Sequence, residues 1–170
     1  MVYPSNFEQK LGFDIIRRLI KEHCLSSIGQ QYVNEISFSE DREEIVKLLT
    51  YTEEFRKVLL FDDGFPSQDY YDMTSDLLHI RIEGTYMEPE QLSTLKLSLF
   101  SIIQILTFFN TRPEEKYPEL HSLARKISIE SSILQKTEKI IDEKSNIRDD
   151  ASPALRKISV PIAKKIWVNY

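Results

Sequence analysis

The amino-acid sequence predicts an all-α fold, an array of six to eight helices, and three observations support this prediction. Apolar residues recur at spacings of three and four along most of the 170-residue chain, which is the spacing of one face of an α-helix. The strict alternation of apolar and polar residues that is typical of half-buried strands is hard to find. Glycine occurs only 4 times, whereas a turn-rich β protein needs more of it.

Length and composition predict one ordinary globular domain. A chain of 170 residues with 41% hydrophobic and 29% charged residues can bury a sizeable core and is unlike a disordered protein. The single cysteine, Cys24, excludes an internal disulfide and fits a reducing compartment. We find neither a signal segment nor an uninterrupted apolar run that could span a bilayer. We therefore expect a cytoplasmic protein.

The first half of the chain predicts a short capped turn and three helices. The turn covers residues 7–10, and the helices begin near Phe13, at Ser26 and behind Ser39 as N-cap. Acidic residues that follow Ser39 suit the positive end of the third helix, which continues for about five turns. The positions expected to face inward in the first two helices are Phe13, Ile16, Leu19, Ile20, Ile28, Tyr32, Val33 and Ile36. The residues that continue the third helix are Ile45, Leu48, Leu49, Thr52, Phe55, Val58 and Leu59.

The middle of the chain contains its most apolar segment. Gly64 and Pro66 end the preceding helix, and a shorter helix runs from about Met73 to near Gly84. Residues 92–109 are apolar on nearly every helical face, which is typical of a buried helix. Because this stretch has only about 18 residues and is interrupted by polar side chains, we predict a central core helix and no membrane span.

The last third predicts two further helices, a charged hairpin and a capped helix start. Leu120 and Leu123 indicate a short helix, and the second contains Ile133, Leu134, Thr137, Ile140 and Ile141. An irregular charged hairpin follows near residues 142–150. Ser152 can then cap a helix in which Pro153 takes the first position. We predict a helical core domain over residues 1–152, and in residues 153–170 the start of a lever-type helix that is truncated or diverged.

Charge is distributed unevenly along the chain. Residues 153–170 hold four basic residues and no acidic ones, so this tail carries +4 and the rest carries −9 of the net charge of −5. Phosphate binding depends on clustered Lys and Arg, so the acidic body is a poor nucleic-acid surface. The candidates for nucleic-acid contact are Arg156, Lys157, Lys164 and Lys165. They predict at most weak, salt-sensitive binding.

No group of residues indicates a catalytic, cofactor or metal site. The four glycines are too far apart for a phosphate-binding loop. His23 and Cys24 point about 100° apart on a helix and do not chelate readily. His79 and His121 have no second histidine at metal-ligand spacing. The acidic runs near residues 40–44 and 62–63 are explained by a helix start and a turn. The aromatic cluster of Phe61, Phe65, Tyr70 and Tyr71 favours packing over base stacking.

Three stretches carry a family resemblance: residues 11–16 with 27–31, residues 44–54 with 62–66, and residues 141–155. They resemble the N-terminal region of the bacterial MutS-two family, the MutS relatives without the mismatch-reading domain. The third stretch holds the most specific signature, an acidic turn followed by a Ser-Pro-x-Leu helix start. The signature residues are Arg148, Asp149, Ala151, Ser152, Pro153 and Leu155.

The resemblance implies a helical core and lever segment. In this family that segment carries a coiled-coil clamp arm and connects to an ATPase. Family members are ATP-dependent dimers that bind DNA and are implicated in suppressing recombination, and some act on collided ribosomes. Many end in an Smr nuclease domain. Neither catalytic part lies in these 170 residues, so the resemblance implies no enzyme activity here. ATP and Mg are expected only in a full-length relative.

The implied partners are the rest of a MutS-like chain, a second protomer, and DNA or the ribosome through the full-length protein. We expect little direct nucleic-acid binding and no membrane contact. The chain departs from the family at Pro161, which interrupts a helix that continues in relatives and costs about 3 kcal/mol in a helix interior. The chain is thus either a cut piece or a natural truncated relative. The alternative is a stand-alone helical adaptor that binds protein partners through an acidic surface.

Overall fold

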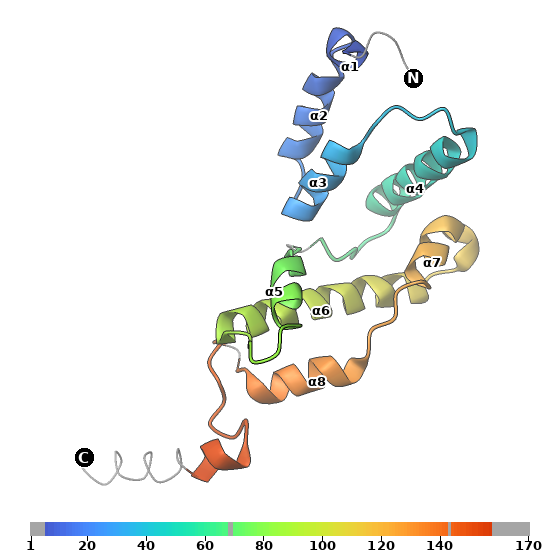
Figure 1. Ribbon diagram of the computed structural model, residues 1–170. Helices are drawn as coiled ribbons and strands as arrows, with labels where there is room; N and C mark the ends of the chain where they lie inside the picture. The colour runs from blue at the N-terminus through green and yellow to red at the C-terminus, as the bar shows by residue number, and fades with distance from the viewer. Residues whose placement is uncertain (1–5, 68–69, 143, 158–170) are drawn as a thin grey trace. The chain divides into compact units, whose positions relative to one another are not determined.

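The computed structural model describes residues 6–67, 70–142 and 144–157, which fall into two units (Figure 1). The N-terminal unit comprises Met1–Asp63 and Ser67–Asp72, and the C-terminal unit comprises Gly64–Pro66 and Met73–Tyr170. Every regular element among the described residues is helical. The prediction of an all-α fold is confirmed. The boundary between residues 152 and 153 stays a prediction, because residues 158–170 lie outside the described part.

The N-terminal unit holds four helices, α1 (Phe7–Lys10), α2 (Phe13–Glu22), α3 (Ser27–Glu35) and α4 (Arg42–Phe61). Gly12 has φ +74° at the N-cap of α2, a left-handed conformation that glycine adopts without strain. Arg17 joins α2 to α3 because its guanidinium donates to the carbonyl oxygens of Val33 at 3.2 Å and Ile36 at 2.6 Å. The same group pairs with Glu8 at 3.1 Å.

Helix α4 begins two residues later than its predicted cap requires. Asp41 is the N-cap, and its Oδ1 accepts hydrogen bonds from the backbone N–H groups of Glu43 at 2.9 Å and Glu44 at 3.2 Å. Ser39 instead donates its hydroxyl to the Glu44 carboxylate at 2.8 Å. The prediction of Ser39 as N-cap is therefore wrong, because the next acceptor of suitable length, Asp41, takes that position.

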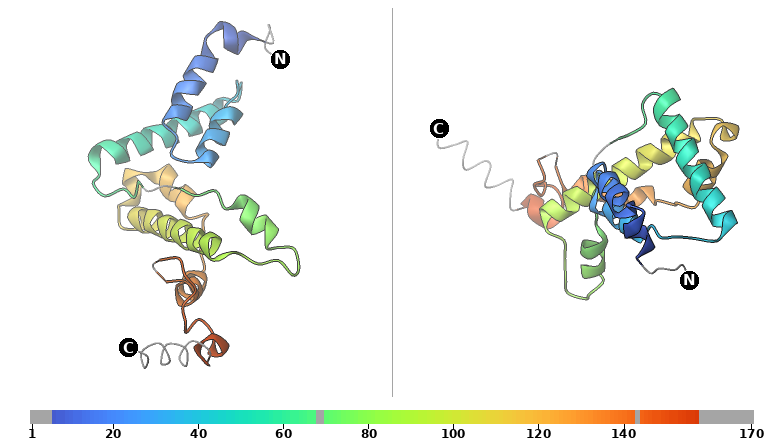
Figure 2. Two further views of the ribbon diagram at one scale, coloured as in Figure 1. Left: turned by 90° about the vertical axis from the view of Figure 1, so that its left-hand side faces the viewer. Right: turned by 90° about the horizontal axis from the view of Figure 1, so that it is seen from above.

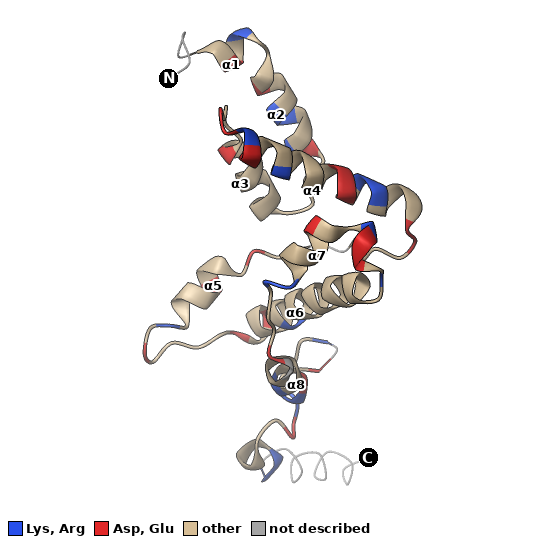
Figure 3. Ribbon diagram, turned by 90° about the vertical axis from the view of Figure 1, so that its right-hand side faces the viewer, with Lys and Arg blue, Asp and Glu red and all other residues tan. Residues whose placement is uncertain are grey.

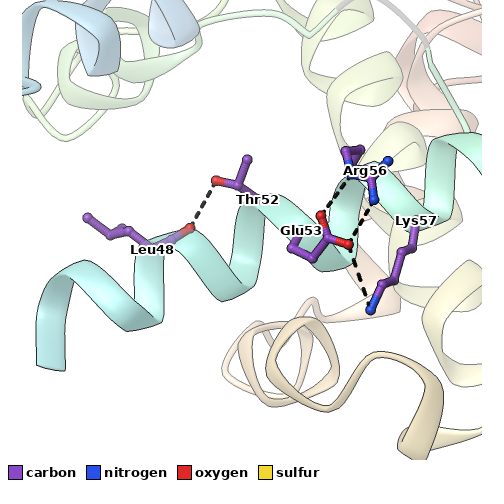
Figure 4. A network of polar contacts seen from close by, with 5 residues as sticks. All are labelled: Leu48, Thr52, Glu53, Arg56 and Lys57. Atoms are coloured by element: carbon purple, nitrogen blue, oxygen red, sulfur yellow. Dashed lines mark hydrogen bonds and ion pairs between the residues drawn. The ribbon is translucent and has the colours of Figure 1, made fainter.

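The remainder of α4 carries local polar contacts that Figure 4 shows in close-up. Glu53 forms ion pairs with Arg56 at 2.8 Å and Lys57 at 3.9 Å, and the Thr52 hydroxyl donates to the Leu48 carbonyl at 2.9 Å. These contacts join neighbouring turns of one helix. The helix ends at Phe61. Gly64 has the expected left-handed conformation, with φ +79°, but lies in the following loop.

The C-terminal unit is organised around its longest helix. It holds α5 (Thr74–His79), α6 (Pro89–Asn110), the short 3-10 helix η1 (Glu114–Lys116), α7 (Pro118–Ala124) and α8 (Ser131–Ile140). Helix α6 packs against α7 and α8, and α8 runs beside it in Figures 1 and 2. Gln91 fixes the start of α6, since its amide oxygen accepts from the Glu88 N–H at 2.8 Å and its Nε2 donates to Asp76 at 2.6 Å.

An aromatic cluster at the C-terminal end of α6, formed by Phe65, Phe108, Phe109 and His121, is one part of the core of this unit. The Phe108 ring meets Phe65 at 5.1 Å and Phe109 at 5.3 Å between centroids, both edge to face. Phe109 in turn meets the His121 ring of α7 at 5.8 Å. Such edge-to-face pairs are a preferred aromatic geometry. Phe65 was predicted to pack rather than to stack on bases, and its contact with Phe108 confirms this prediction.

Helix α6 is central in its unit but is not buried on every side as predicted. Its buried residues are Ser101, Phe108 and Phe109, whereas Leu97 is 47% and Phe100 is 44% exposed. The reason is geometric, because α7 and α8 cover only part of its circumference. Among the described residues, α6 is also the helix that could cross a membrane by length and composition alone.

Candidate functional site: the charged hairpin and the helix start that follows it

The hairpin begins where α8 ends. Ile141 and Ile147 form an isolated antiparallel bridge, the Asp142 N–H donates to the Asn146 carbonyl at 2.9 Å, and the Arg148 N–H donates to the Ile140 carbonyl at 2.8 Å. Ile141 is 1% exposed, whereas Ile147 is 50% exposed. The prediction of an irregular hairpin near residues 142–150 is confirmed. The buried Ile141 side chain anchors it, and the other described residues of the hairpin are half-buried or exposed.

Asp142 organises the loop of the hairpin. Its Oδ1 accepts hydrogen bonds from the backbone N–H groups of Lys144 and Asn146, each at 2.8 Å. The hydrogen bond from Asn146 is the main reason that the pKa of Asp142 lies below its ordinary value, since amide donors favour the charged carboxylate. Ser145 has φ +63°, and its hydroxyl lies 2.8 Å from the Ser93 hydroxyl of α6.

We expect the order of this loop to depend on pH. Because the folded pKa of Asp142 is lowered, its contribution to loop stability is fully present above the unfolded pKa of about 3.9 and is lost as pH falls through the folded value. The protection of the Asn146 amide, which is its exchange rate relative to the intrinsic rate at the same pH, should therefore decrease below about pH 4. The variant Asp142→Ala should show fast exchange already at neutral pH. Equal protection of Asn146 in both proteins would contradict this role.

The signature residues continue directly into a helix start. The Arg148 Nε lies 3.1 Å from the Asp150 carboxylate, and this contact lowers the pKa of Asp150. The Ser152 Oγ accepts a hydrogen bond from the Leu155 N–H at 3.2 Å, and residues 153–157 are helical. Ser152 thus caps the helix as predicted, with Pro153 in its first turn.

The structure describes only half of the predicted nucleic-acid candidates. Arg156 and Lys157 are exposed on the helix start, while Lys164 and Lys165 lie outside the described residues. Whether the four share a helical face stays a prediction. The remaining signature residues, Asp149, Ala151 and Leu155, lie at the surface or half-buried. No predicted site residue is therefore placed in an enclosed cavity within the described part.

Two open hollows adjoin the hairpin and share Glu138 and Arg148 in their linings. The first, of about 540 Å³, also includes Lys139 and Asp150. The second, of about 520 Å³, also includes Lys96, Ile141, Asp142 and Lys144. Lysines from α6, α8 and the hairpin therefore converge on one surface, and Figure 3 shows basic and acidic segments interleaved there. Sequence reasoning missed these lysines, because nothing in their spacing connects Lys96 with Lys139.

The N-terminal unit has a different kind of surface. An apolar hollow of about 350 Å³ is lined mainly by Phe7, Leu11, Phe13, Ile16 and Phe38. Beside it, the apolar residues of α2 are exposed, and they are Ile15, Ile16, Leu19 and Ile20. Of these, Ile16, Leu19 and Ile20 were predicted to face inward, so that prediction is wrong for them. In the structure the inner side of α2 is taken by Arg17, whose hydrogen bonds to α3 require that orientation.

The described residues contain no group of three or more His, Cys, Asp or Glu side chains that could hold a metal ion. Cys24 makes a local contact, with its Sγ 3.4 Å from the Ile20 carbonyl. His121 is buried against Phe109. The side chains that distinguish the hairpin surface are charged groups suited to binding a charged partner.

Comparison with known proteins finds relatives that are similar to this chain in sequence. The chain is 29% identical over 156 residues to the Endonuclease MutS2 of Alkaliphilus oremlandii, covering 91% of the chain and 20% of that protein. It is 27% identical over 150 residues to the proteins of the same name from a Geobacillus species and from Fusobacterium nucleatum, covering 87% of the chain and 19% of each relative. No family model and no solved structure matches the chain.

These relatives confirm the resemblance that the sequence indicated. The similarity includes most of the described helices and extends over about nine tenths of the chain, whereas the chain spans about one fifth of the length of the curated relatives it matches. The all-α array with its charged hairpin agrees with the predicted core and lever arrangement. The chain is thus similar to a MutS-like N-terminal region of the MutS2 proteins.

Proposed function

We propose that this chain is a non-catalytic helical scaffold, the core and lever segment of a MutS-like, ATP-dependent DNA-binding protein. The observation that carries the proposal is the similarity of nearly the whole chain to one fifth of the MutS2 relatives. The helical fold supports it, since a helical array that contains a hairpin and a capped helix start can connect two parts of a larger protein. The larger protein would act in recombination suppression, in DNA repair or in ribosome rescue.

The catalytic parts of such a protein would lie outside these 170 residues. The relatives are named endonucleases as whole proteins, and the chain corresponds to a small part of them. We propose that the ATPase, the Smr nuclease domain and the ATP and Mg sites belong to other parts of a full-length protein. A second protomer, and DNA or the ribosome, would then be partners of that protein in the bacterial cytoplasm. The rival proposal remains a stand-alone adaptor that binds proteins through its acidic surface.

The reading frame after Tyr170 separates the two proposals. A frame that continues into G-x-x-x-x-G-K-[ST], the loop that binds nucleotide phosphates, supports the scaffold segment. A stop codon directly after Tyr170 supports the adaptor. The purified 170-residue chain should show no ATP hydrolysis and no nuclease activity above a buffer control. An ATP-hydrolysing activity that follows the chain through successive purification columns would contradict both proposals.

A further inference from the structure

We propose that the surface formed by Lys96, Lys139 and Lys144, the hairpin lysine surface, contacts the phosphate backbone of a nucleic acid. The inference rests on the proposed function and deepens it, because it assigns a contact surface to the scaffold segment. It also differs from the sequence-based expectation, which placed the contact in residues 156–165. The surface exists only in the folded chain, since its lysines come from α6, α8 and the hairpin.

The geometry brings the three lysines to two adjoining hollows. Lys96 and Lys144 line one hollow, and Lys139 lines the other. Arg148 and Glu138 line both. The hollows are open and have volumes of about 520 and 540 Å³, so they can receive an extended, solvated chain better than they can enclose a small molecule.

The charges of this surface favour an anionic partner once the internal pairs are considered. The residues that line the two hollows carry four positive and three negative charges, which leaves an excess of one positive charge. Arg148 and Asp150 pair at 3.1 Å. The Asp142 carboxylate accepts hydrogen bonds from two backbone amides of the loop, but it remains charged and lowers the net attraction for an anion. The three lysines form no ion pair within the described residues. Glu138 opposes the attraction, which limits the expected affinity.

The chemical nature of the expected partner follows from the fact that the three cations of this surface are lysines. Lysine presents a hydrated point charge on a flexible stem, which suits the non-directional contact with a phosphate and does not read bases. A phosphate backbone offers regularly spaced charges and releases bound counterions when lysines approach it. An acidic protein surface releases fewer counterions than a phosphate backbone does when lysines approach it. We therefore expect sequence-independent binding that is strongest at low salt.

A fluorescence-anisotropy titration of the 170-residue chain tests the inference. The probes are a labelled DNA duplex and labelled single-stranded DNA and RNA of the same sequence, which distinguish the source of the phosphates. We expect the triple variant Lys96→Ala, Lys139→Ala, Lys144→Ala to bind at least about tenfold more weakly at low salt. The slope of log K against log salt should decrease in magnitude by about 2.7 on duplex DNA, from roughly 0.9 per phosphate contact.

The matched control is Lys10→Ala, Lys47→Ala, Lys126→Ala, which removes the same charge from exposed positions that line neither hollow and should retain most of the binding. Circular dichroism melting checks that both variants fold. Absence of binding by the unchanged chain overturns the inference, as does loss of binding only in Arg156→Ala, Lys157→Ala. Displacement of DNA by polyglutamate at equal charge would assign the surface to acidic proteins instead. None of these results alters the reading-frame test of the proposed function.

Discussion

Replacing Phe108 with alanine should destabilise the C-terminal unit by about 3–5 kcal/mol, the range for large aromatic residues in cores. The Phe108 side chain is 6% exposed and meets the rings of Phe65 and Phe109. The Arg112 guanidinium also lies over it, 3.3 Å from the ring centroid. Because total domain stability is about 5–15 kcal/mol, the loss should be visible as a large shift of the urea midpoint.

The control for this variant lies on the same helix. Phe100 is 44% exposed, so Phe100→Ala removes the same side chain from a site that remains in contact with water. We expect it to cost less than about 1 kcal/mol, as surface substitutions usually do. Equal destabilisation by the two variants would mean that the exposed side of α6 is covered in solution. The comparison therefore tests the aromatic cluster and the exposure of α6 together.

Replacing Ile141 with alanine should cost about 2–5 kcal/mol, because the side chain is fully buried where α8 meets the hairpin. The variant should also increase hydrogen exchange at the Arg148 amide, which bonds to the Ile140 carbonyl beside it. Thermal unfolding followed by circular dichroism gives the first quantity, and exchange measured by NMR gives the second. Loss of stability without faster exchange would show that Ile141 supports α8 alone.

Ile147 provides the matched control, since it is the bridge partner of Ile141 but is 50% exposed. Ile147→Ala removes a similar volume and leaves the backbone bridge in place. Its effect on stability should be below about 1 kcal/mol. A larger effect would show that the exposed side of the hairpin is packed in solution. The hairpin lysine surface would then be covered in part, and its residues would have to be assigned again.

Local signals in the sequence predicted the helix starts well. Ser26 and Ser152 act as caps because each places a side-chain oxygen next to free amides at the start of a helix. The prediction of Ser39 as N-cap was wrong because Asp41, an equally good cap two residues later, accepts the hydrogen bond from the Glu43 N–H. Two suitable residues so close together cannot be ranked by propensity alone. Helix existence was therefore predictable, while one boundary was not.

The packing of the helices was harder to predict. Periodicity identified the apolar face of α2 but placed it inward, because a pattern states which residues are apolar and not what covers them. The long-range hydrogen bonds of Arg17 determine the orientation of α2 and have no signal in the pattern. The hairpin lysine surface was missed for a related reason, because Lys96 and Lys144 line the same hollow only once α6 and α8 lie side by side.

The hydroxyl contact between Ser93 and Ser145 has a consequence for how the chain folds. The two residues are 52 positions apart in the sequence, so their approach closes a long loop whose entropic cost grows with its length. Helices α1, α2 and α3 instead meet their neighbours in sequence and close only short loops. Non-local pairings slow folding. The hairpin should therefore dock on α6 late, after the neighbouring helices of the N-terminal unit have formed their contacts.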